Sequence, residues 1–380
     1  MEVFPNTILS PMDGVTDAPF RRLCRVLSGN RMGLLVSEFV PTDGDTVFCL
    51  DGHKQLKFFP EERPFGVQIF GRFPDRMAAA AKKIAENLHP EFIEVNAGCP
   101  APKVAGKGSG SGLLRDLPRL QEILHDVRAA LDSSSVDIPL TLKCRIGWDD
   151  ESINVMETLK IAEGEGVEML TVHGRTRLQG YNGLANWEWI GKVAAAAKIP
   201  VIGNGDVNSV AVARERIETY GVSGVSIGRG AMHNPWIFGQ IADAWEGKPE
   251  REISASEALD VFPLYYKFKL EDGSTEMGAL GRLKQLGARL CKGFCLDEKN
   301  VIASPMNNGG EAIYNVDGQD AGMYVRQTLL TAQTPDDFFE RLEVLRNGVV
   351  KSMRYDPNRL VNLNGAKETE LKFGDQFAGR

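Results

Sequence analysis

The amino-acid sequence predicts a (β/α)₈ barrel followed by a small all-helical domain. Eight short apolar runs recur within roughly 240 residues, and each is followed by a turn signal and a helical stretch. Strands that alternate with helices form parallel βαβ units, and eight such units close into a barrel. After Ala244 the helical pattern continues without strands. The 380 residues suit one barrel with an accessory unit, so we expect a barrel over 1–243, a helical domain over 244–355 and a tail over 356–380.

The predicted strands follow one another in chain order, and most end at glycine or proline, which interrupt regular strands. Their side chains are mainly apolar or β-branched, as a strand covered on its outer face by helices requires. The helical stretches between them supply the crossovers that parallel strands need. The runs occupy residues 7–11, 34–39, 65–71, 92–98, 139–147, 168–176, 200–206 and 223–230.

The helical domain is predicted from capping signals and from leucines at helical spacing. Ser254 and Glu257 form a capping-box pattern, although Pro263 is expected to kink or shorten the helix that follows. Thr334 with Pro335 predicts the start of the last helix. Residues 300–320 are rich in turn formers and are expected to form a long surface loop. The predicted buried stripe of the middle helix is Met277, Leu280, Leu283, Leu286 and Leu290.

Composition indicates a protein of a reducing compartment. No apolar run is long enough for a membrane span, and the first ten residues lack the pattern of a signal peptide. The six cysteines follow neither a disulfide framework nor the spacing of a zinc site, so we expect free thiols and no metal. The net charge of −7 argues against indiscriminate coating of nucleic acid. We expect a cytoplasmic protein that is monomeric.

Polar side chains at the ends of the predicted strands indicate a ligand site. Side chains alternate across a strand, and the apolar set must face the helices. In 139–147 this places Leu140, Leu142 and Cys144 outward. Burying a lysine or arginine without an anion is costly, so an anionic ligand is expected. The inward set is Gln68, Glu94, Asn96, Thr141, Lys143, Arg145, Thr171, His173 and Asn204.

The last two predicted strands end in glycine-rich turns that suit a phosphate group. These turns are Asn204-Gly205-Asp206 and Gly228 to Ala231, at the usual phosphate site of a barrel. A lysine in the same mouth suggests flavin mononucleotide (FMN), because Lys143 can stabilise negative charge on the N1–C2=O edge of the reduced flavin. Gln68 would bind another edge of the ring. His173 and Arg229 would meet the phosphate.

A collinear set of motifs resembles the tRNA-dihydrouridine synthases. It runs from SPMDGVTDAPFR at 10–21 through VNAGCP, LKCRIGW, VHGRTR, GNGDV and SIGRGA to GRLKQL at 281–286. The resemblance implies an FMN-binding catalytic barrel and a helical tRNA-binding domain. It also implies reduction of the C5–C6 bond of a D-loop uridine in tRNA, with NADPH as electron donor. The motifs SEFVP, GSGSGLLRD, RIGWDD and GRTRLQGY look most like the dihydrouridine synthase C branch, which acts on uridine sixteen.

The same resemblance implies roles for individual residues. Cys99 would be the catalytic acid, and a thiol with its ordinary pKa is protonated near neutral pH. The other cysteines, including Cys24, Cys144, Cys291 and Cys295, fit buried structural positions. The substrate base would lie near Asn96, Arg145 and Tyr181. The cofactor would contact Pro11, Met12, Gln68, Lys143, His173, Asn204, Gly205, Asp206, Gly228 and Arg229.

One predicted helix of the second domain carries the basic residues expected to bind tRNA. Arg282 and Arg289 are seven residues apart, which places them on roughly one helix face, and Lys284 and Lys292 lie in the same stretch. We expect Arg282 and Lys284 to contact the RNA backbone, in a salt-sensitive manner. Further contributions are expected from Arg21, Arg22, Arg25, Arg175 and Arg177 of the barrel loops.

Two other functions remain open at this stage. An FMN barrel that acts on a free pyrimidine, like a dihydroorotate dehydrogenase, would not need the helical domain. A barrel that has lost its chemistry and only binds RNA would be colourless when purified. The presence of Cys99, Lys143, Arg145 and His173 argues against the second alternative.

Overall fold

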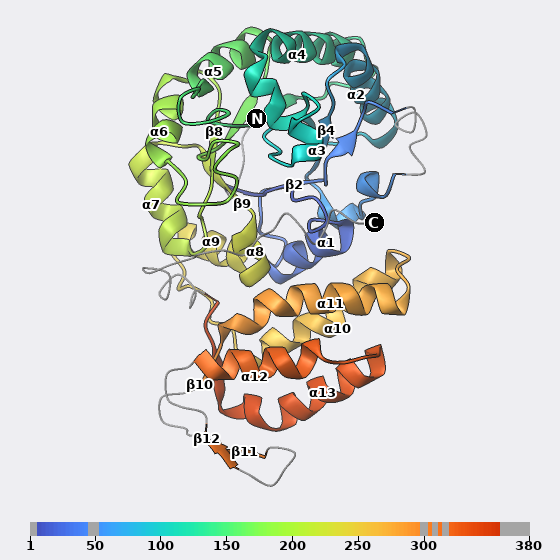
Figure 1. Ribbon diagram of the computed structural model, residues 1–380, viewed down its shortest axis with the longest axis vertical. Coiled ribbons are helices and arrows are strands. Elements are labelled where there is room, and N and C mark those ends of the chain that lie inside the picture. Colours follow the sequence, from blue (N-terminus) through green and yellow to red (C-terminus); the bar gives the residue numbers. More distant parts are fainter. Residues whose placement is uncertain (1–5, 45–52, 297–302, 306–310, 314–318, 358–380) are drawn as a thin grey trace.

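A closed parallel barrel and a group of helices beneath it make up the molecule, as the ribbon of this computed structural model shows (Figure 1). The structure describes residues 6–44, 53–296, 303–305, 311–313 and 319–357. In that part of the chain, no helix combines the length and the apolar character that crossing a membrane requires.

The barrel sheet has the strand order β2-β1-β9-β8-β7-β6-β5-β4-β3, and an additional pairing of β2 with β4 closes it. All of its neighbours are parallel. The short strand β3 pairs with the end of β4 while β2 pairs with its beginning. The eight predicted strands are therefore confirmed. They are β1 (Thr7–Leu9), β2 (Leu34–Val36), β4 (Phe65–Phe70), β5 (Phe92–Ala97), β6 (Leu140–Arg145), β7 (Met169–His173), β8 (Val201–Asn204) and β9 (Gly224–Ile227), with β3 at Val40–Pro41.

Helices surround the barrel, and several begin at a side chain that caps the first turn. Asp17 accepts a hydrogen bond from Phe20 N at the start of α1, and Ser209 does the same for Val212 N at the start of α7. These caps satisfy backbone N–H groups that have no partner within the helix. The barrel helices are α1 (Ala18–Leu27), α2 (Pro74–Leu88), α3 (Pro102–Ala105), α4 (Leu117–Asp132), α5 (Val155–Gly164), α6 (Trp187–Ala196), α7 (Val210–Tyr220), α8 (Arg229–His233) and α9 (Ile237–Trp245).

Two apolar clusters confirm the predicted alternation of side chains. Leu140, Leu142 and Cys144 belong to the large core between the strands and the helices. A separate small cluster fills the floor of the barrel. In β5 and β7 the apolar member of this floor cluster comes first along the strand, and the inward polar residues follow. The mouth at the strand ends is consequently polar. The floor cluster consists of Ile8, Leu34, Val36, Phe92, Met169 and Ile202.

The second part of the chain contains α10 (Ala255–Glu271), α11 (Glu276–Leu290), α12 (Gln319–Leu330) and α13 (Pro335–Asn347). Ser254 caps α10 by accepting from Glu257 N at 3.1 Å. The Glu257 carboxylate pairs with Arg251 at 2.5 Å and not with the cap. Contrary to the expected shortening, α10 continues through Pro263. Buried apolar side chains lie on both sides of the proline, and their packing outweighs the backbone hydrogen bond that it removes.

The predicted stripe of α11 is confirmed at its four leucines, which are buried, but not at Met277, which is 59% exposed. Met277 lies in the first turn of the helix. Thr334 caps α13 by accepting from Asp337 N at 3.1 Å, as predicted. Phe338, Leu342 and Leu345 of α13 face the core of the helical group.

The prediction of helices alone after Ala244 is wrong at four short strands. They are β10 (Phe294–Leu296), β11 (Ala303–Pro305), β12 (Glu311–Ile313) and β13 (Met353–Tyr355). β10 pairs with β13, and Tyr355 stabilises this pairing, because its ring packs on Phe294 and its hydroxyl donates to the carbonyls of His233 and Leu290. The rest of the expected 300–320 loop and most of the 356–380 tail lie outside the described residues. The domain boundaries stay a prediction.

Ion pairs join the helical group to the loop that follows β1. Lys269 Nζ lies 3.1 Å from the Asp17 carboxylate, and Arg282 Nη2 lies 3.5 Å from the same group. Arg282 also donates to the Gly14 carbonyl at 2.5 Å. This part of the barrel rim is therefore occupied by α10 and α11, which lie beneath α1 in Figure 1. Two further ion pairs join the same parts, Arg22 with Glu271 and Lys57 with Asp272.

Candidate functional site at the barrel mouth

A directional chain of side-chain hydrogen bonds crosses from β4 to the loop after β5. Gln68 Nε2 donates to Glu94 Oε1 at 2.7 Å, and Asn96 Nδ2 donates to Gln68 Oε1 at 2.8 Å. Asn96 Oδ1 then accepts from the backbone N–H groups of Gly98 and Cys99, both at 2.9 Å. The side chains of Gln68, Glu94 and Asn96 are all buried. The network places Cys99 at a fixed position relative to the barrel interior.

Lys143 lies in the centre of the mouth. Its Nζ donates to Asn204 Oδ1 at 3.0 Å, and Asn204 Nδ2 donates to the Ser226 carbonyl at 2.7 Å. Burial lowers the pKa of Lys143 to about 8, and the nearby Glu94 carboxylate opposes this shift. Burial raises the pKa of Glu94 to about 7, and Lys143 opposes that shift in turn. The two groups form a buried pair whose protonation states depend on each other.

His173 stands among positive charges on β7, the strand next to the one that carries Lys143. Burial lowers its pKa well below the ordinary value, and the charges of Arg145, Lys143, Arg175 and Arg229 lower it further. The ring is therefore neutral at pH 7. A neutral imidazole with several cations around it suits contact with an anionic group.

The Asp206 carboxylate holds two of these cations in place. Its oxygens lie 2.8 and 2.9 Å from Arg175 Nη2 and 3.4 Å from Arg229 Nη2. It also accepts from the backbone N–H of Ala185 at 2.7 Å. Asp206 was predicted to contact a cofactor, and in this structure its oxygens bind protein donors. It orients the two guanidinium groups.

Two predicted glycines bring the backbone close to other site residues. Gly205 has φ +129, and a Cβ there would lie 2.5 Å from the Ala185 Cβ and 3.2 Å from the His173 ring. A Cβ at Gly228 would lie 3.3 Å from the Met12 sulfur. The loop containing Pro11 and Met12 is joined to β9, because Ser10 N donates to the Ile227 carbonyl at 2.9 Å. The loops after β1, β8 and β9 thus meet at one corner of the mouth.

Cys99 lies at the edge of the mouth with its backbone held on both sides. Its carbonyl accepts from Ser111 Oγ at 2.8 Å and from Ser111 N at 3.2 Å. A Cβ at Gly110 would lie 3.1 Å from the Cys99 Cβ, so only glycine leaves this side open. Burial raises the pKa of the thiol above its ordinary value. The thiol therefore carries its proton at neutral pH. The other described cysteines are also free and are buried, as expected: Cys24, Cys144, Cys291 and Cys295.

Arg145 connects the Cys99 loop with the loop after β7. It donates to the carbonyls of Gly98 at 2.8 Å, Thr176 at 2.9 Å and Gly180 at 2.8 Å. Within the described residues it pairs with no carboxylate, so its positive charge is not neutralised there. Burial lowers its pKa to about 10, which leaves it charged at pH 7.

Tyr181 lies over this charged region and is 46% exposed. Its ring centroid is 4.9 Å from the Arg229 guanidinium carbon and 5.7 Å from that of Arg145. The His173 ring lies 6.4 Å away. Tyr181 thus presents an aromatic surface to solvent above the two cations.

Arg282 and Lys284, which are expected to bind RNA, both lie near other groups of the protein. Arg282 is turned toward the barrel and binds Gly14 and Asp17, whereas Lys284 lies near Asp337 of α13, whose pKa it helps to lower. Their binding to RNA stays a prediction.

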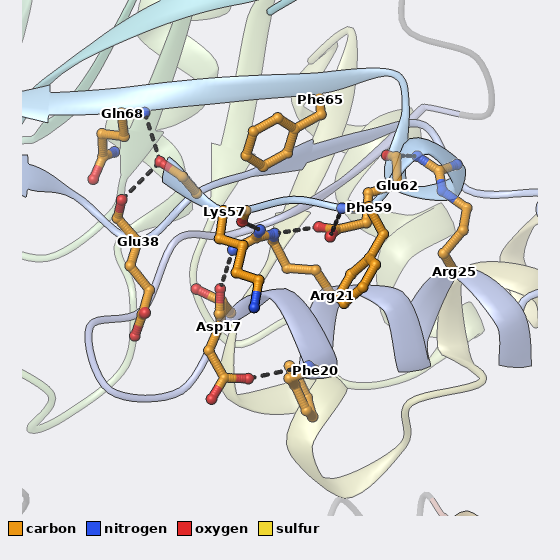
Figure 2. A network of polar contacts seen from close by, with 12 residues as sticks. Asp17, Phe20, Arg21, Arg25, Glu38, Lys57, Phe59, Glu62, Phe65 and Gln68 are labelled. Carbon is orange, nitrogen blue, oxygen red and sulfur yellow. Dashed lines mark hydrogen bonds and ion pairs between the residues drawn. The ribbon is translucent and has the colours of Figure 1, made fainter. Parts of the chain in front are cut away.

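Several barrel arginines expected to help are also engaged within the protein. Arg21 pairs with Glu62 at 2.6 Å, as Figure 2 shows, and Arg25 donates to the carbonyls of Met32, Gly33 and Glu62. Arg22 is bound to Glu61 and Glu271. Arg175 is bound to Asp206.

Two features of the site were missed by sequence reasoning. The Glu94–Gln68 bond was not predicted, although both residues have the inward parity that could have indicated it. The ion pair between Arg175 and Asp206 could not be predicted from the sequence pattern, because the two residues are 31 positions apart. Among the described residues, no group of three or more His, Cys, Asp or Glu side chains is placed to hold a metal ion.

Comparison with known proteins gives a family match. The dihydrouridine synthase (Dus) family model matches residues 8–299. A probable tRNA-dihydrouridine synthase of Rhodobacter capsulatus is 38% identical over 286 residues, which cover 74% of this chain and 85% of that protein. A tRNA-dihydrouridine synthase B of Pseudomonas putida is 45% identical over 236 residues, which cover 62% of this chain and 67% of that protein.

Solved structures show weaker similarity. Histamine dehydrogenase from Rhizobium sp. 4-9 is 11% identical with a TM-score of 0.48, covering 69% of this chain and 49% of that one. An old yellow enzyme homologue from Zymomonas mobilis is 10% identical with a TM-score of 0.44, covering 65% of this chain and 90% of that one.

Proposed function

This chain is an enzyme of the dihydrouridine synthase family, and from that premise we propose that it reduces the C5–C6 double bond of a D-loop uridine in tRNA. We propose FMN as the cofactor, NADPH as the electron donor and Cys99 as the proton donor. The barrel over 1–243 would carry the chemistry, and the helices over 244–355 would contribute to binding tRNA.

The polar groups of the mouth support FMN as the cofactor. Lys143 and Gln68 present polar groups toward the centre, and the cations around His173 lie by the glycine loops after β8 and β9. In the described part of the chain, the Thr171 and Ser226 hydroxyls are buried without a hydrogen-bond partner. Both have the inward parity, since their neighbours along β7 and β9 belong to the outer core. A polar ligand would offer partners to such hydroxyls.

Each residue has a proposed contact with the cofactor. Lys143, Gln68 and Asn204 would bind the polar edge of the flavin, with Pro11 and Met12 beside it. The phosphate would lie against Gly205, Asp206, Gly228, His173 and Arg229, where Asp206 acts by holding Arg229 in place. When bound, FMN would supply the hydride for C6 of the uracil after reduction by NADPH.

The proton at C5 is assigned to the Cys99 thiol. A general acid must carry its proton at working pH, and burial raises the pKa of this thiol. Arg145 binds the Gly98 carbonyl beside it, so the acid and the nearby positive charge keep a fixed spacing. The positive charge of Arg145 would stabilise the negative charge that develops on the uracil ring before protonation.

The substrate base is proposed to lie between Cys99 and Tyr181. The exposed Tyr181 ring offers a stacking surface, and stacking on aromatic side chains is a common way to hold an unstacked base. The Asn96 amide has one N–H left after its bond to Gln68, and this N–H could reach the base. The branch within the family, the choice of uridine sixteen, the cytoplasmic location and the monomeric state stay predictions.

The half-buried Lys143–Asn204 hydrogen bond carries this proposal, because it places a charged amine in the mouth near the Cys99 thiol, and the thiol influences the pKa of Lys143. The test is mass spectrometry of nuclease-digested tRNA from cells with and without the protein, together with the absorbance spectrum of the purified protein. Loss of one dihydrouridine and a flavin spectrum are expected. A flavin spectrum with unchanged tRNA would favour a free pyrimidine as substrate, and a colourless protein would favour RNA binding without chemistry.

A further inference from the structure

Two arginines lie over one tryptophan ring on the rim of the barrel. The guanidinium carbons of Arg115 and Arg177 are each 4.7 Å from the Trp148 ring centroid. Arg115 is exposed, and Trp148 and Arg177 are half-buried. We name these three residues the arginine–tryptophan patch. Contact with the indole holds both cations against the same ring without neutralising their charge.

The patch resembles Arg145, and differs from Arg21 and Arg175, in having no carboxylate partner within the described residues. Within the described residues, neither Arg115 nor Arg177 forms an ion pair, although acidic residues at 149–151 follow Trp148 in the chain. The Nε of Arg177 is buried and has no hydrogen-bond partner there. By contrast, Arg21 and Arg175 are each bound to a carboxylate. Two cations on one ring without an anion indicate a binding surface for an external anion.

Backbone hydrogen bonds make the patch part of the mouth. Arg177 N donates to the Gly147 carbonyl at 3.0 Å, and Leu178 N donates to the Trp148 carbonyl at 2.9 Å. Arg145 binds the carbonyls of Thr176 and Gly180 on the other side of the same segment. The same loop carries both Arg177 and Tyr181. Its position is set by the hydrogen bonds to Gly147 and Trp148 and by those from Arg145.

The patch and the helical group lie on opposite sides of the mouth. Arg115, Trp148 and Arg177 follow β5, β6 and β7, whereas α10 and α11 bind the loop after β1. In the strand order of the closed sheet, β6 lies across the barrel from β1. Figure 1 shows α4 and α5 on one side of the barrel and α1 with α11 on the opposite side. A molecule that touches both would cover the entrance to the site.

We propose that the arginine–tryptophan patch binds the phosphate backbone of the RNA substrate on the side of the mouth away from the helices. This inference rests on the proposed function, because it assumes that tRNA is the substrate. Guanidinium groups bind phosphate oxygens with paired hydrogen bonds, and a shared indole orients them before the RNA arrives. Such contacts position the RNA without reading its sequence.

The test measures binding of an unmodified tRNA transcript to the full-length flavoprotein at several salt concentrations. Arg115→Ala with Arg177→Ala should weaken binding about tenfold at low salt and lower the slope of log Kd against log salt by about two, one for each arginine. The Arg115→Lys and Arg177→Lys pair keeps the charge and should keep most of the slope. Arg63→Ala is the matched control, because this guanidinium also lies over an aromatic ring, 5.1 Å from the Phe58 centroid, just before β4 at the other end of the barrel.

The outcomes separate the patch from the proposed function. Thermal unfolding and the flavin spectrum of each variant must match the wild type, which keeps a folding defect from imitating the effect. If the wild type binds tRNA and the double alanine variant binds it equally well with the same salt slope, the patch is not an RNA contact. If the wild type neither binds nor modifies tRNA, the proposed function itself is wrong.

Discussion

The Gln68 side-chain amide donates a 2.7 Å hydrogen bond to the Glu94 carboxyl group, and this bond sets the orientation of the Gln68 and Asn96 side-chain amides. Because the Gln68 N–H points to Glu94, its carbonyl oxygen faces Asn96 and accepts from it. The Asn96 carbonyl oxygen is then turned toward the backbone N–H groups of Gly98 and Cys99. Glu94 thus helps to position Cys99, the proposed acid, through Gln68 and Asn96 and without contacting it.

Replacing Glu94 should disturb Cys99. Glu94→Leu removes the acceptor that orients Gln68, so we expect dihydrouridine formation to fall about tenfold or more, in line with the loss of a buried hydrogen bond to a charged group. The loosened loop should also let iodoacetamide alkylate Cys99 faster. Glu94→Gln can still accept through its carbonyl oxygen and should restore the alkylation rate. An unchanged alkylation rate in Glu94→Leu would show that the position of the Cys99 loop does not depend on these side-chain hydrogen bonds.

Lys143→Met should lose the flavin or its reactivity. The variant removes the positive charge at the centre of the mouth and leaves Asn204 without its donor. The flavin content of the purified protein and the rate of its reduction by NADPH measure the effect. Lys160→Met, at an exposed lysine of α5, removes the same charge and should behave like the wild type. Full flavin content with wild-type turnover in Lys143→Met would contradict the cofactor site.

Cys99→Ala should keep its flavin and its oxidation of NADPH but lose dihydrouridine formation by about a hundredfold, the usual size of a general-acid contribution. The residue lies at the edge of the mouth and its backbone, which the substitution preserves, holds the loop. Quantifying dihydrouridine in a tRNA transcript checks this. Near-normal product from the variant would remove Cys99 from the mechanism.

Flavin affinity should fall as the pH rises through about 8. The pKa of Lys143 is lowered to about 8, so the amine is charged below this pH and neutral above it. The carbonyl edge of the flavin accepts a stronger hydrogen bond from the charged amine than from the neutral one, so affinity is lost on the alkaline side. Titrating the apoprotein with FMN at pH 7 and pH 9 measures the change. Lys143→Arg stays charged over this range, and a pH dependence that persists in this variant would assign it to another group.

Arg282→Glu should lower the melting temperature. It places a carboxylate beside Asp17 where Arg282 now binds Asp17 and Gly14, so the contact between barrel and helices becomes repulsive. Each kcal/mol lost corresponds to a shift of about 2–4 °C for a domain of this size. Lys284→Glu is the control, because its partner Asp337 is a surface residue of α13. Equal melting temperatures for the two variants would show that the Arg282 contact adds no stability.

The sequence by itself determined the barrel and the polar mouth. Alternation of side chains is a local property of a strand, so the inward positions of Lys143, His173 and Asn204 follow from the chain alone. Capping residues are local as well, and Ser254 and Thr334 begin their helices where the sequence predicts. The strand ends meet at one rim only because parallel strands close into a ring, which the repeat of eight units indicated.

Only the tertiary structure decided which charges are available to a ligand. Arg21 meets Glu62 across 41 residues, and Arg282 meets Gly14 across 268, so neither partner can be read from neighbouring residues. The pairing of β10 with β13 likewise depends on Tyr355 reaching Phe294 and the Leu290 carbonyl. Ion pairs and short strands of this kind form between segments that folding brings together. For that reason the arginines predicted to bind RNA are mostly engaged within the protein, whereas Arg115 and Arg177 have no carboxylate partner among the described residues.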